Sequence, residues 1–411
     1  MRQARRLLTL CATLILAAHA AIAANWPQWR GLAATGVTKE KGFPVTWGGK
    51  DNANILWKAE LPKNDDSPSS PIVWGNRVYV ATTLREDHRV TCYQRADGKM
   101  LWSTPVEKGP WKKTDQRGGW GAPTPATDGE RVYALFGTAI LAALNCADGK
   151  KVWSRPLEHY SFDVAMGSSP IVYEGSAVLF SGLTKKDSNI TAFERETGKV
   201  KWKLELPKIG FGHSTPAITA IAGKPRLIVA ANRRSTGILG VDPAKGELLW
   251  SAPGDGETAS PAIGANMAYC DSGRGGGGYA LDLTKTVGAS EVVLKWKLSS
   301  VNQDLGSPII VGDHIYRMGS GGWLNCLELA TGKKVCSKKL DGAYSWVSPV
   351  ATADGLIYFA CAGRSYVVRS GPTCEILAVN DLPDRNHASP AFSDGTIFLK
   401  GRKHLYCIGR K

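Results

Sequence analysis

A Ser-Pro or Thr-Pro dipeptide stands at each of eight positions that are spaced 41 to 54 residues apart along the chain. Each copy opens a segment of short alternating apolar runs with Gly, Asp and Ser between them, which is typical of antiparallel strands joined by turns. The prolines are Pro71, Pro125, Pro170, Pro216, Pro261, Pro308, Pro349 and Pro390. A period of roughly 40–50 residues with four short strands per unit predicts the blades of a β-propeller.

A second signature closes the first four repeats, where a Gly is followed four residues later by a Trp. The pairs are Gly98 with Trp102, Gly149 with Trp153, Gly198 with Trp202, and Gly246 with Trp250. We expect the Gly to form a tight hairpin turn and the Trp to lie on the outermost strand of its blade. Since a buried Trp removes roughly 150–250 Å² from water, one Trp per blade, packed on the next blade, would hold the ring together.

The closure, as in Gly149-Lys150-Lys151-Val152-Trp153, resembles the tryptophan-docking repeat of the pyrroloquinoline quinone (PQQ)-like propellers. The resemblance covers nearly all of residues 25–411. It implies an all-β, eight-bladed β-propeller with four antiparallel strands per blade. This superfamily contains quinoprotein alcohol dehydrogenases and also non-enzymatic outer-membrane assembly proteins of the BamB type, so the resemblance leaves the activity open.

The ends of the chain predict how the ring closes. Only 21 residues follow Pro390, enough for three strands, whereas residues 55–62 stand alone before the first repeat and match residues 200–207 closely. We therefore expect the N-terminal strand to supply the outer strand of the last blade, which removes an open edge. The propeller is assigned to residues 53–411. Residues 24–52 form an aromatic-rich arm expected to pack on the outside of the ring, with a partner-binding arm as the alternative.

The first 23 residues have the pattern of a secretory signal peptide. Three Arg precede an apolar run over residues 7–18, and small residues allow cleavage after Ala23. A lipoprotein signal needs a small residue before its Cys, whereas Leu10 precedes Cys11, so we expect no lipid anchor. No later run is long enough to span a membrane. The expected location is the periplasm or the exterior of a bacterial envelope.

The chain is basic, with 51 Lys and Arg against 36 Asp and Glu, and its net charge falls to about +12 once the three Arg of the signal are removed. A basic surface favours anionic partners such as nucleic acid, lipid headgroups or acidic glycans, and export argues against nucleic acid. The partner we expect is a protein or an acidic glycan on the funnel face. Charge spread evenly over a solvated surface is the alternative. Loops between the second and third strands carry the candidate residues of an anionic-partner face: Arg233, Arg234, Arg274, Arg364 and Arg402.

A second candidate site lies at the predicted central funnel. His213 and His387 each stand three residues before the Pro that opens a blade, at the position that propeller geometry places on the funnel rim. The full candidate set is Trp120, His213, Glu257, Asp304, Trp346, Arg385 and His387. Polar and aromatic groups converging on a channel favour a ligand site. A water-filled channel with no specific ligand is the alternative.

The mature chain has eight Cys, an even number that permits disulfides in an oxidising compartment. Cys326 and Cys336 lie at equal distance on either side of the Thr331-Gly332 turn, so they should face each other across a hairpin. Cys336 also stands where other repeats have Trp. The spacing predicts a Cys326–Cys336 disulfide, and two reduced core thiols are the competing interpretation.

No serine-hydrolase elbow, zinc-protease helix or Cys-x-x-Cys motif is present. Residues 273–278 match a dinucleotide-loop pattern, but a strand rather than a helix follows them. Similar quinoproteins hold PQQ between a Trp and a disulfide of adjacent cysteines, with Ca²⁺ beside it, and this chain has no adjacent Cys pair. We therefore expect a non-enzymatic binding scaffold without a cofactor. The alternatives are a PQQ-dependent dehydrogenase and a propeller that binds or cleaves anionic glycans.

Overall fold

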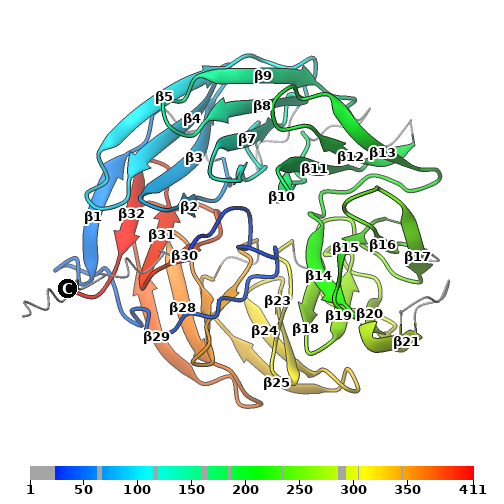
Figure 1. Cartoon of the computed structure of the whole chain (residues 1–411). Helices are drawn as coiled ribbons and strands as arrows, with labels where there is room; N and C mark the ends of the chain where they lie inside the picture. Colours follow the sequence, from blue (N-terminus) through cyan, green and yellow to red (C-terminus); the bar gives the residue numbers. More distant parts are fainter. Residues whose placement is uncertain are drawn as a thin grey trace, which may run out of the picture.

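The computed structural model describes residues 24–62, 67–113, 119–159, 165–183, 187–232, 236–285, 293–303, 305–343 and 346–411. The described strands form eight separate four-stranded antiparallel sheets, arranged as blades around a central axis (Figure 1). One 3-10 turn, η1 (Leu283–Lys285), is the only helical element in these ranges. The predicted all-β, eight-bladed propeller is confirmed.

Each blade takes its strands from one sequence repeat, except the last. Blades one and two contain β2 (Ile72–Trp74), β3 (Arg77–Leu84), β4 (Asp87–Gln94), β5 (Met100–Val106), β6 (Ala126–Thr127), β7 (Arg131–Phe136), β8 (Ile140–Asn145) and β9 (Lys151–Pro156). Blades three and four contain β10 (Ile171–Tyr173), β11 (Ser176–Ser181), β12 (Ser188–Phe193), β13 (Val200–Leu206), β14 (Ala217–Ile221), β15 (Lys224–Ala230), β16 (Ile238–Val241) and β17 (Leu248–Ala252).

Blades five and six contain β18 (Ala262–Gly264), β19 (Met267–Asp271), β20 (Gly278–Asp282), β21 (Val293–Leu298), β22 (Ile309–Val311), β23 (His314–Gly319), β24 (Trp323–Glu328) and β25 (Lys334–Lys339). Blades seven and eight contain β26 (Val350–Ala351), β27 (Leu356–Phe359), β28 (Arg364–Arg369), β29 (Ile376–Asp381), β30 (Ala391–Ser393), β31 (Thr396–Lys400), β32 (His404–Ile408) and β1 (Ile55–Glu60).

The ring closes through β1, as predicted. This strand pairs antiparallel with β32, with Trp57 opposite Cys407, and completes the sheet of blade eight. In Figure 1 the blue β1 lies beside the red β32. The two ends of the propeller domain therefore share one blade, so neither can detach without exposing a strand edge.

The middle strands are buried on both faces, whereas the outermost strands alternate. All six residues of β11 are buried, while β13 alternates between exposed and half-buried positions. The middle strands are covered by a neighbouring blade on each side, so they read as continuous apolar runs rather than as alternating ones. The core is accordingly divided among the contacts between blades rather than gathered at the centre.

Tryptophans join most of the blades as predicted. Trp153 of blade two lies on the turn glycine of blade three, where a Cβ built on Gly198 would come within 2.6 Å of its ring, and its Nε1 donates to Arg195 O at 2.8 Å. Trp57, Trp102, Trp202 and Trp296 lie on the corresponding glycines of their next blades. The exceptions are Trp250, which lies over Gly240 of its own blade, and the Cys336 and Ala378 positions of blades six and seven.

The repeated Ser/Thr-Pro dipeptide has a structural role that the sequence did not reveal. In each blade the backbone N–H of this Ser or Thr donates to the hydroxyl oxygen of its counterpart in the next blade, at 2.8 to 3.0 Å. The eight bonds form a closed ring, since Ser389 of blade eight donates to Ser70 of blade one. We call this the hydroxyl ring; its members are Ser70, Thr124, Ser169, Thr215, Ser260, Ser307, Ser348 and Ser389.

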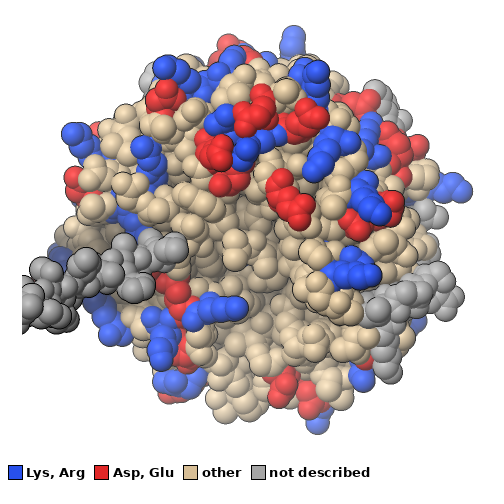
Figure 2. Space-filling model, viewed as in Figure 1, with Lys and Arg blue, Asp and Glu red and all other residues tan. Residues whose placement is uncertain are grey.

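The N-terminal arm lies across the centre of the ring, so its predicted place on the outside is wrong (Figure 1). Its backbone pairs with strands next to the channel, as between Trp26 and Val73, where both N–H···O distances are 2.9 Å. Further contacts reach Thr127, Val172, Ile218, Pro261, Pro308, Ala351 and Ser393, so the arm touches every blade. The arm is irregular and rich in Trp and Pro. Its backbone N–H and C=O groups find hydrogen-bond partners on the unpaired inner edges of the blades. In the same view, Figure 2 shows charged residues over the blades and a mostly uncharged centre.

Candidate functional site

The other end of the channel holds a cavity of about 220 Å³. Its floor includes Trp29 of the arm, and its wall includes seven of the eight members of the hydroxyl ring. The arm bonds mainly to residues that follow the repeated Pro, whereas the cavity is lined by residues that precede it. The arm thus fills one end of the channel and leaves a blind funnel at the other.

The rim of the funnel follows a simple positional rule. Each blade contributes the residue three positions before its repeated Pro, and all eight such residues line the cavity. They are Pro68, Ala122, Gly167, His213, Thr258, Leu305, Trp346 and His387. The rim is therefore asymmetric. The rim residues of blades one to three are small or apolar, whereas blades four and five contribute the polar His213 and Thr258, and blades seven and eight contribute Trp346 and His387.

His213 is held neutral at the rim. Its backbone N–H donates to Glu257 O at 2.6 Å, and its ring meets Phe211 edge to face with centroids 4.7 Å apart. Burial lowers the pKa of His213 to about 4, and the cation of Arg274 acts in the same direction. The neutral imidazole can therefore donate or accept a hydrogen bond at neutral pH, but it brings no charge to the funnel.

Arg274 is the cation of the funnel wall. It follows β19 and lines the cavity, and its Nε lies 3.0 Å from Glu257 Oε1. Burial raises the pKa of Glu257, although Arg274 opposes that shift. The Arg274 side chain is 43% exposed, so it can meet an incoming carboxylate without losing much hydration.

Two aromatic rings form the opposite side of the funnel. The rings of Trp346 and His387 have centroids 5.1 Å apart, and Trp29 supplies a third aromatic surface at the floor. These are wide, flat apolar surfaces with polar edges. Together with Arg274 they can hold an apolar or aromatic group that carries a nearby negative charge.

Comparison with known proteins places the chain in a family. A sequence model of the family described as outer membrane protein assembly factor BamB matches residues 45–186 and 186–408. The chain belongs to the BamB family. It is 21% identical to BamB of Yersinia pestis over 357 residues, which cover 83% of each protein.

Solved structures with the same fold include both BamB and dehydrogenases. BamB from Moraxella catarrhalis matches with a TM-score of 0.60 and 13% identity, over 86% of this chain and 99% of that one. A europium-containing methanol dehydrogenase matches with a TM-score of 0.66 and 13% identity, over 94% and 89%. At these identities the likeness shows the propeller alone and does not separate a binding protein from an enzyme.

The described residues of the funnel wall do not supply the ligand set that a Ca²⁺ ion needs. Ca²⁺ takes six to eight oxygen ligands, chiefly carboxylates and carbonyls. No carboxylate belongs to the described cavity wall. Across the described ranges, no cluster of three or more His, Cys, Asp or Glu is placed to hold a metal ion.

The structure brings together only part of each predicted residue set. Of the funnel set, His213, Trp346 and His387 line the cavity, and Glu257 lies behind Arg274. Trp120 does not line the cavity, and Arg385 lies in a separate groove with Arg402, Lys403 and His404. Asp304, Arg233 and Arg234 lie outside the described residues, as does the predicted signal peptide.

The predicted basic face is divided as well. Arg364 is engaged by Asp381 through two contacts of 3.0 and 3.1 Å, and Asp384 accepts the backbone N–H of Arg402 at 2.9 Å. Of the described members of that face, Arg274 alone lines the funnel. In the parts of the chain that the structure describes, no helix has the length and apolar character needed to cross a bilayer.

Sequence reasoning missed the floor and the hydroxyls of the wall. Trp29 was assigned to an outer arm, and the repeated Ser and Thr were used only to count blades. A signal was present for both. A polar residue kept at the same place in eight repeats indicates a shared hydrogen bond, and an arm with buried aromatics needs a surface that covers it.

The predicted Cys326–Cys336 disulfide stays a prediction, because Cys326, Cys336 and Cys374 are all free thiols in the structure. Cys326 and Cys336 are opposite each other in the β24–β25 register, as expected. Cys374, from the next blade, packs in the same apolar cluster as both of them. The hairpin symmetry around residues 331–332 could not show this third cysteine, because it arrives from another repeat.

Proposed function

We propose that this BamB-family protein is a non-enzymatic scaffold of the bacterial envelope that binds a segment of another protein at the mouth of the funnel. The observation that carries this proposal is the blind funnel itself, in which one residue from each blade converges above a floor closed by Trp29. Its volume of about 220 Å³ suits one or two inserted side chains better than a bulky cofactor. Export by the signal peptide of residues 1–23 to the periplasm or beyond is part of the proposal.

The chemistry of the wall suggests what the partner inserts. Trp346, His387 and Trp29 offer aromatic surfaces, on which an aromatic or aliphatic anchor would bury most of its area. Arg274 offers a planar pair of donors for a carboxylate beside that anchor. An acidic glycan also carries a carboxylate, but its sugar rings present less apolar surface than an aromatic or aliphatic side chain.

The test is a pull-down from envelope extracts, followed by titration of the recovered partner against variants. We expect Trp346→Ala to weaken binding about 30-fold, as for a central aromatic contact. Arg274→Ser should weaken binding less and flatten its dependence on salt. Arg364→Ser is the matched control, since Arg364 is paired with Asp381 and does not line the funnel.

Three outcomes would contradict the proposal. A partner that binds both funnel variants as tightly as the parent protein would place the interface elsewhere. Capture of an acidic glycan, with no protein, would change the class of partner. Turnover of an alcohol or sugar after addition of PQQ and Ca²⁺ would support the dehydrogenase alternative instead.

A further inference from the structure

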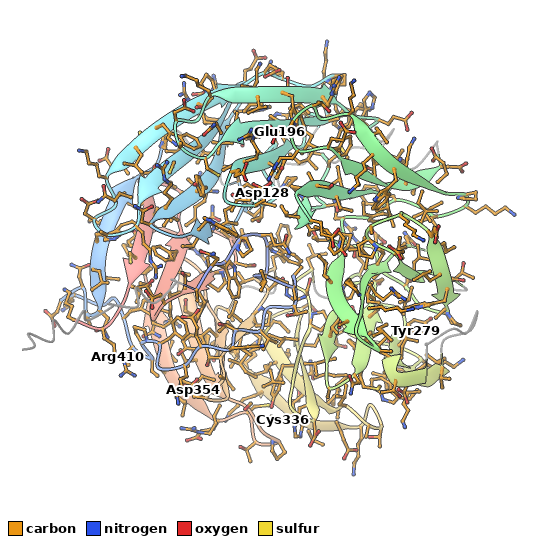
Figure 3. The ribbon with its side chains drawn as sticks, in the orientation of Figure 1. Asp128, Glu196, Tyr279, Cys336, Asp354 and Arg410 are labelled. Carbon is orange, nitrogen blue, oxygen red and sulfur yellow. The ribbon has the colours of Figure 1, made fainter. Side chains whose placement is uncertain are left out.

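The seam between blades six and seven lacks the tryptophan found at most other seams. The register position held by Trp57, Trp102, Trp153 and their counterparts is Cys336 in β25, opposite Cys326. Figure 3 places Cys336 at the outer rim of the ring, on the side where Figure 1 shows β25. A small side chain at this place leaves the neighbouring turn without its usual apolar cover.

The turn of blade seven brings a third cysteine into this gap. Cys374 lies between β28 and β29, has a positive φ of 48°, and is fully buried. It packs in one apolar cluster with Cys326 and Cys336. Elsewhere the same turn contributes a Gly beneath a Trp, so a set of three thiols has replaced the Trp–Gly contact.

Other contacts hold the turn in place. Tyr316 of blade six donates through its hydroxyl to Gly371 O at 3.1 Å and accepts the Gly371 N–H. The Cys326 thiol also points at Gly371 O, at 3.9 Å. Because blade six hydrogen-bonds to both the N–H and the C=O of Gly371, the turn is held in place and Cys374 stays close to Cys326 and Cys336.

A shared metal ion is not the explanation that this cluster favours. Three thiolates could serve a soft metal, but among the described residues no group has a suitable arrangement. The three thiols instead pack in one apolar cluster with Tyr316, Leu324 and Val368. A disulfide needs only two sulfur atoms at short range and suits such a dry environment.

We propose that Cys374 forms a disulfide with a cysteine of blade six, Cys336 or Cys326, and that this bond links blades six and seven covalently. The bond takes the place of the tryptophan contact at this seam. It differs from a Cys326–Cys336 bond, which would stay within one blade and could not join two.

The reaction needs a disulfide donor as oxidant, and each step balances. The Cys336 thiol is partly exposed, so as a thiolate it can attack the donor disulfide, form a mixed disulfide and release one donor thiol. The Cys374 thiol then attacks the Cys336 sulfur of the mixed disulfide, its proton passes to the departing donor thiolate, and the protein disulfide closes. Two protein thiols lose two protons and two electrons, and the donor becomes two thiols.

The third thiol allows the bond to move. The neighbouring Cys374 thiol lowers the pKa of Cys326, and the same contact raises the pKa of Cys374, so Cys326 is the thiol that attacks a neighbouring disulfide. A Cys336–Cys374 bond can therefore exchange to Cys326–Cys374 with no net oxidation. Both pairings cross the seam, because Cys374 belongs to each.

The experiment uses the purified chain in a buffer of oxidised and reduced glutathione, in one arm folded throughout and in another refolded from urea. Free thiols are then alkylated and the peptides mapped without reduction. We expect Cys374 linked to Cys336 or Cys326. We also expect the oxidised protein to melt on the order of 5 °C above the reduced protein.

Matched variants separate the bond from general effects of losing a cysteine. Cys374→Ala should abolish the oxidative rise in melting temperature. Cys407→Ala should keep it, because Cys407 has the register position of Cys326 but faces Trp57. A Cys326–Cys336 link, three alkylated thiols in both arms, or an oxidative rise that survives in Cys374→Ala would each overturn the proposal.

Discussion

The two ends of the central channel are built from the same repeat and yet offer different surfaces. At one end the arm bonds to the inner edge of the blades, and its Arg30 is buried, with Nη2 donating to Pro308 O at 2.5 Å. At the other end, residues three positions before each Pro surround an open cavity. The hydroxyl ring lies between the two.

This difference separates stability from recognition. At the arm end, backbone and side-chain groups are engaged in contacts within the protein, so a substitution there should lower the free energy of unfolding. At the funnel end, half-buried side chains face a cavity, so a substitution there should lower the affinity for a partner and leave folding intact. The substitutions and conditions below test that division, in order of decreasing effect.

Removal of residues 24–61 should have the largest effect. It deletes the arm and β1 together, which opens the channel and exposes the edge of β32 in blade eight. We expect aggregation, measured by light scattering and size-exclusion chromatography, because an unpaired strand edge invites pairing with another chain. A soluble truncation that unfolds cooperatively would refute ring closure by β1.

A fall in pH should have the next largest effect on stability, because it favours protonation of a buried histidine. His88 is buried in blade one, its ring stacks on Phe136 with centroids 5.0 Å apart, and burial lowers its pKa to about 4. The unfolded chain, with an ordinary His pKa near 6.5, binds more protons between these values, so stability should fall as pH falls from about 6.5 to 4.

Through His88 alone, the free energy of unfolding should fall by about 3 kcal/mol over this pH range. It can be measured by urea unfolding at several pH values, with His88→Phe as the comparison. This variant keeps the stacked ring and removes the titrating group, so its stability should depend less on pH. An identical pH profile for the two proteins would exclude His88 as the source.

The two channel arginines should then behave in opposite ways. Arg30→Met removes buried donors to Pro308 O and Pro261 O at the arm end, and should cost about 2 kcal/mol of unfolding free energy. Arg274→Ser at the funnel should stay within about 0.5 kcal/mol of the parent protein, since that side chain is partly exposed. Equal losses in the two variants, measured by urea unfolding, would remove the distinction between the ends.

The smallest change concerns one link of the hydroxyl ring. Ser260→Ala removes the oxygen that accepts the Thr215 N–H at 2.8 Å and should cost about 1 kcal/mol. Ser260→Thr is the control, because blades two and four already have Thr at this position. If the Ala and Thr variants melt together, the hydroxyl at this position contributes nothing.

Much of this architecture could be predicted from the sequence because it is periodic. The repeated Pro and the Gly-to-Trp spacing gave the number of blades, and the isolated match at residues 55–62 gave the closing strand. The position of His213 and His387 before the Pro placed them in the funnel, because every blade presents that position to the same rim.

What the sequence could not predict depends on contacts between distant segments. The arm has no periodicity, so its aromatic residues indicated that some surface covers it but not that its backbone would pair along the channel. The last bond of the hydroxyl ring joins Ser389 to Ser70, and Cys374 meets Cys336 only because two blades adjoin. Arg364 was assigned to a free basic face, but Asp381 on the adjacent strand engages it.

The most direct test of the central claim is a photocrosslink from each end of the channel. A photoreactive residue would replace Leu305, which lines the funnel, or Leu32, which is 74% exposed on the arm. In envelope extracts we expect a crosslinked protein partner from position 305 and none from position 32. A partner captured from position 32 alone would contradict the assignment of recognition to the funnel.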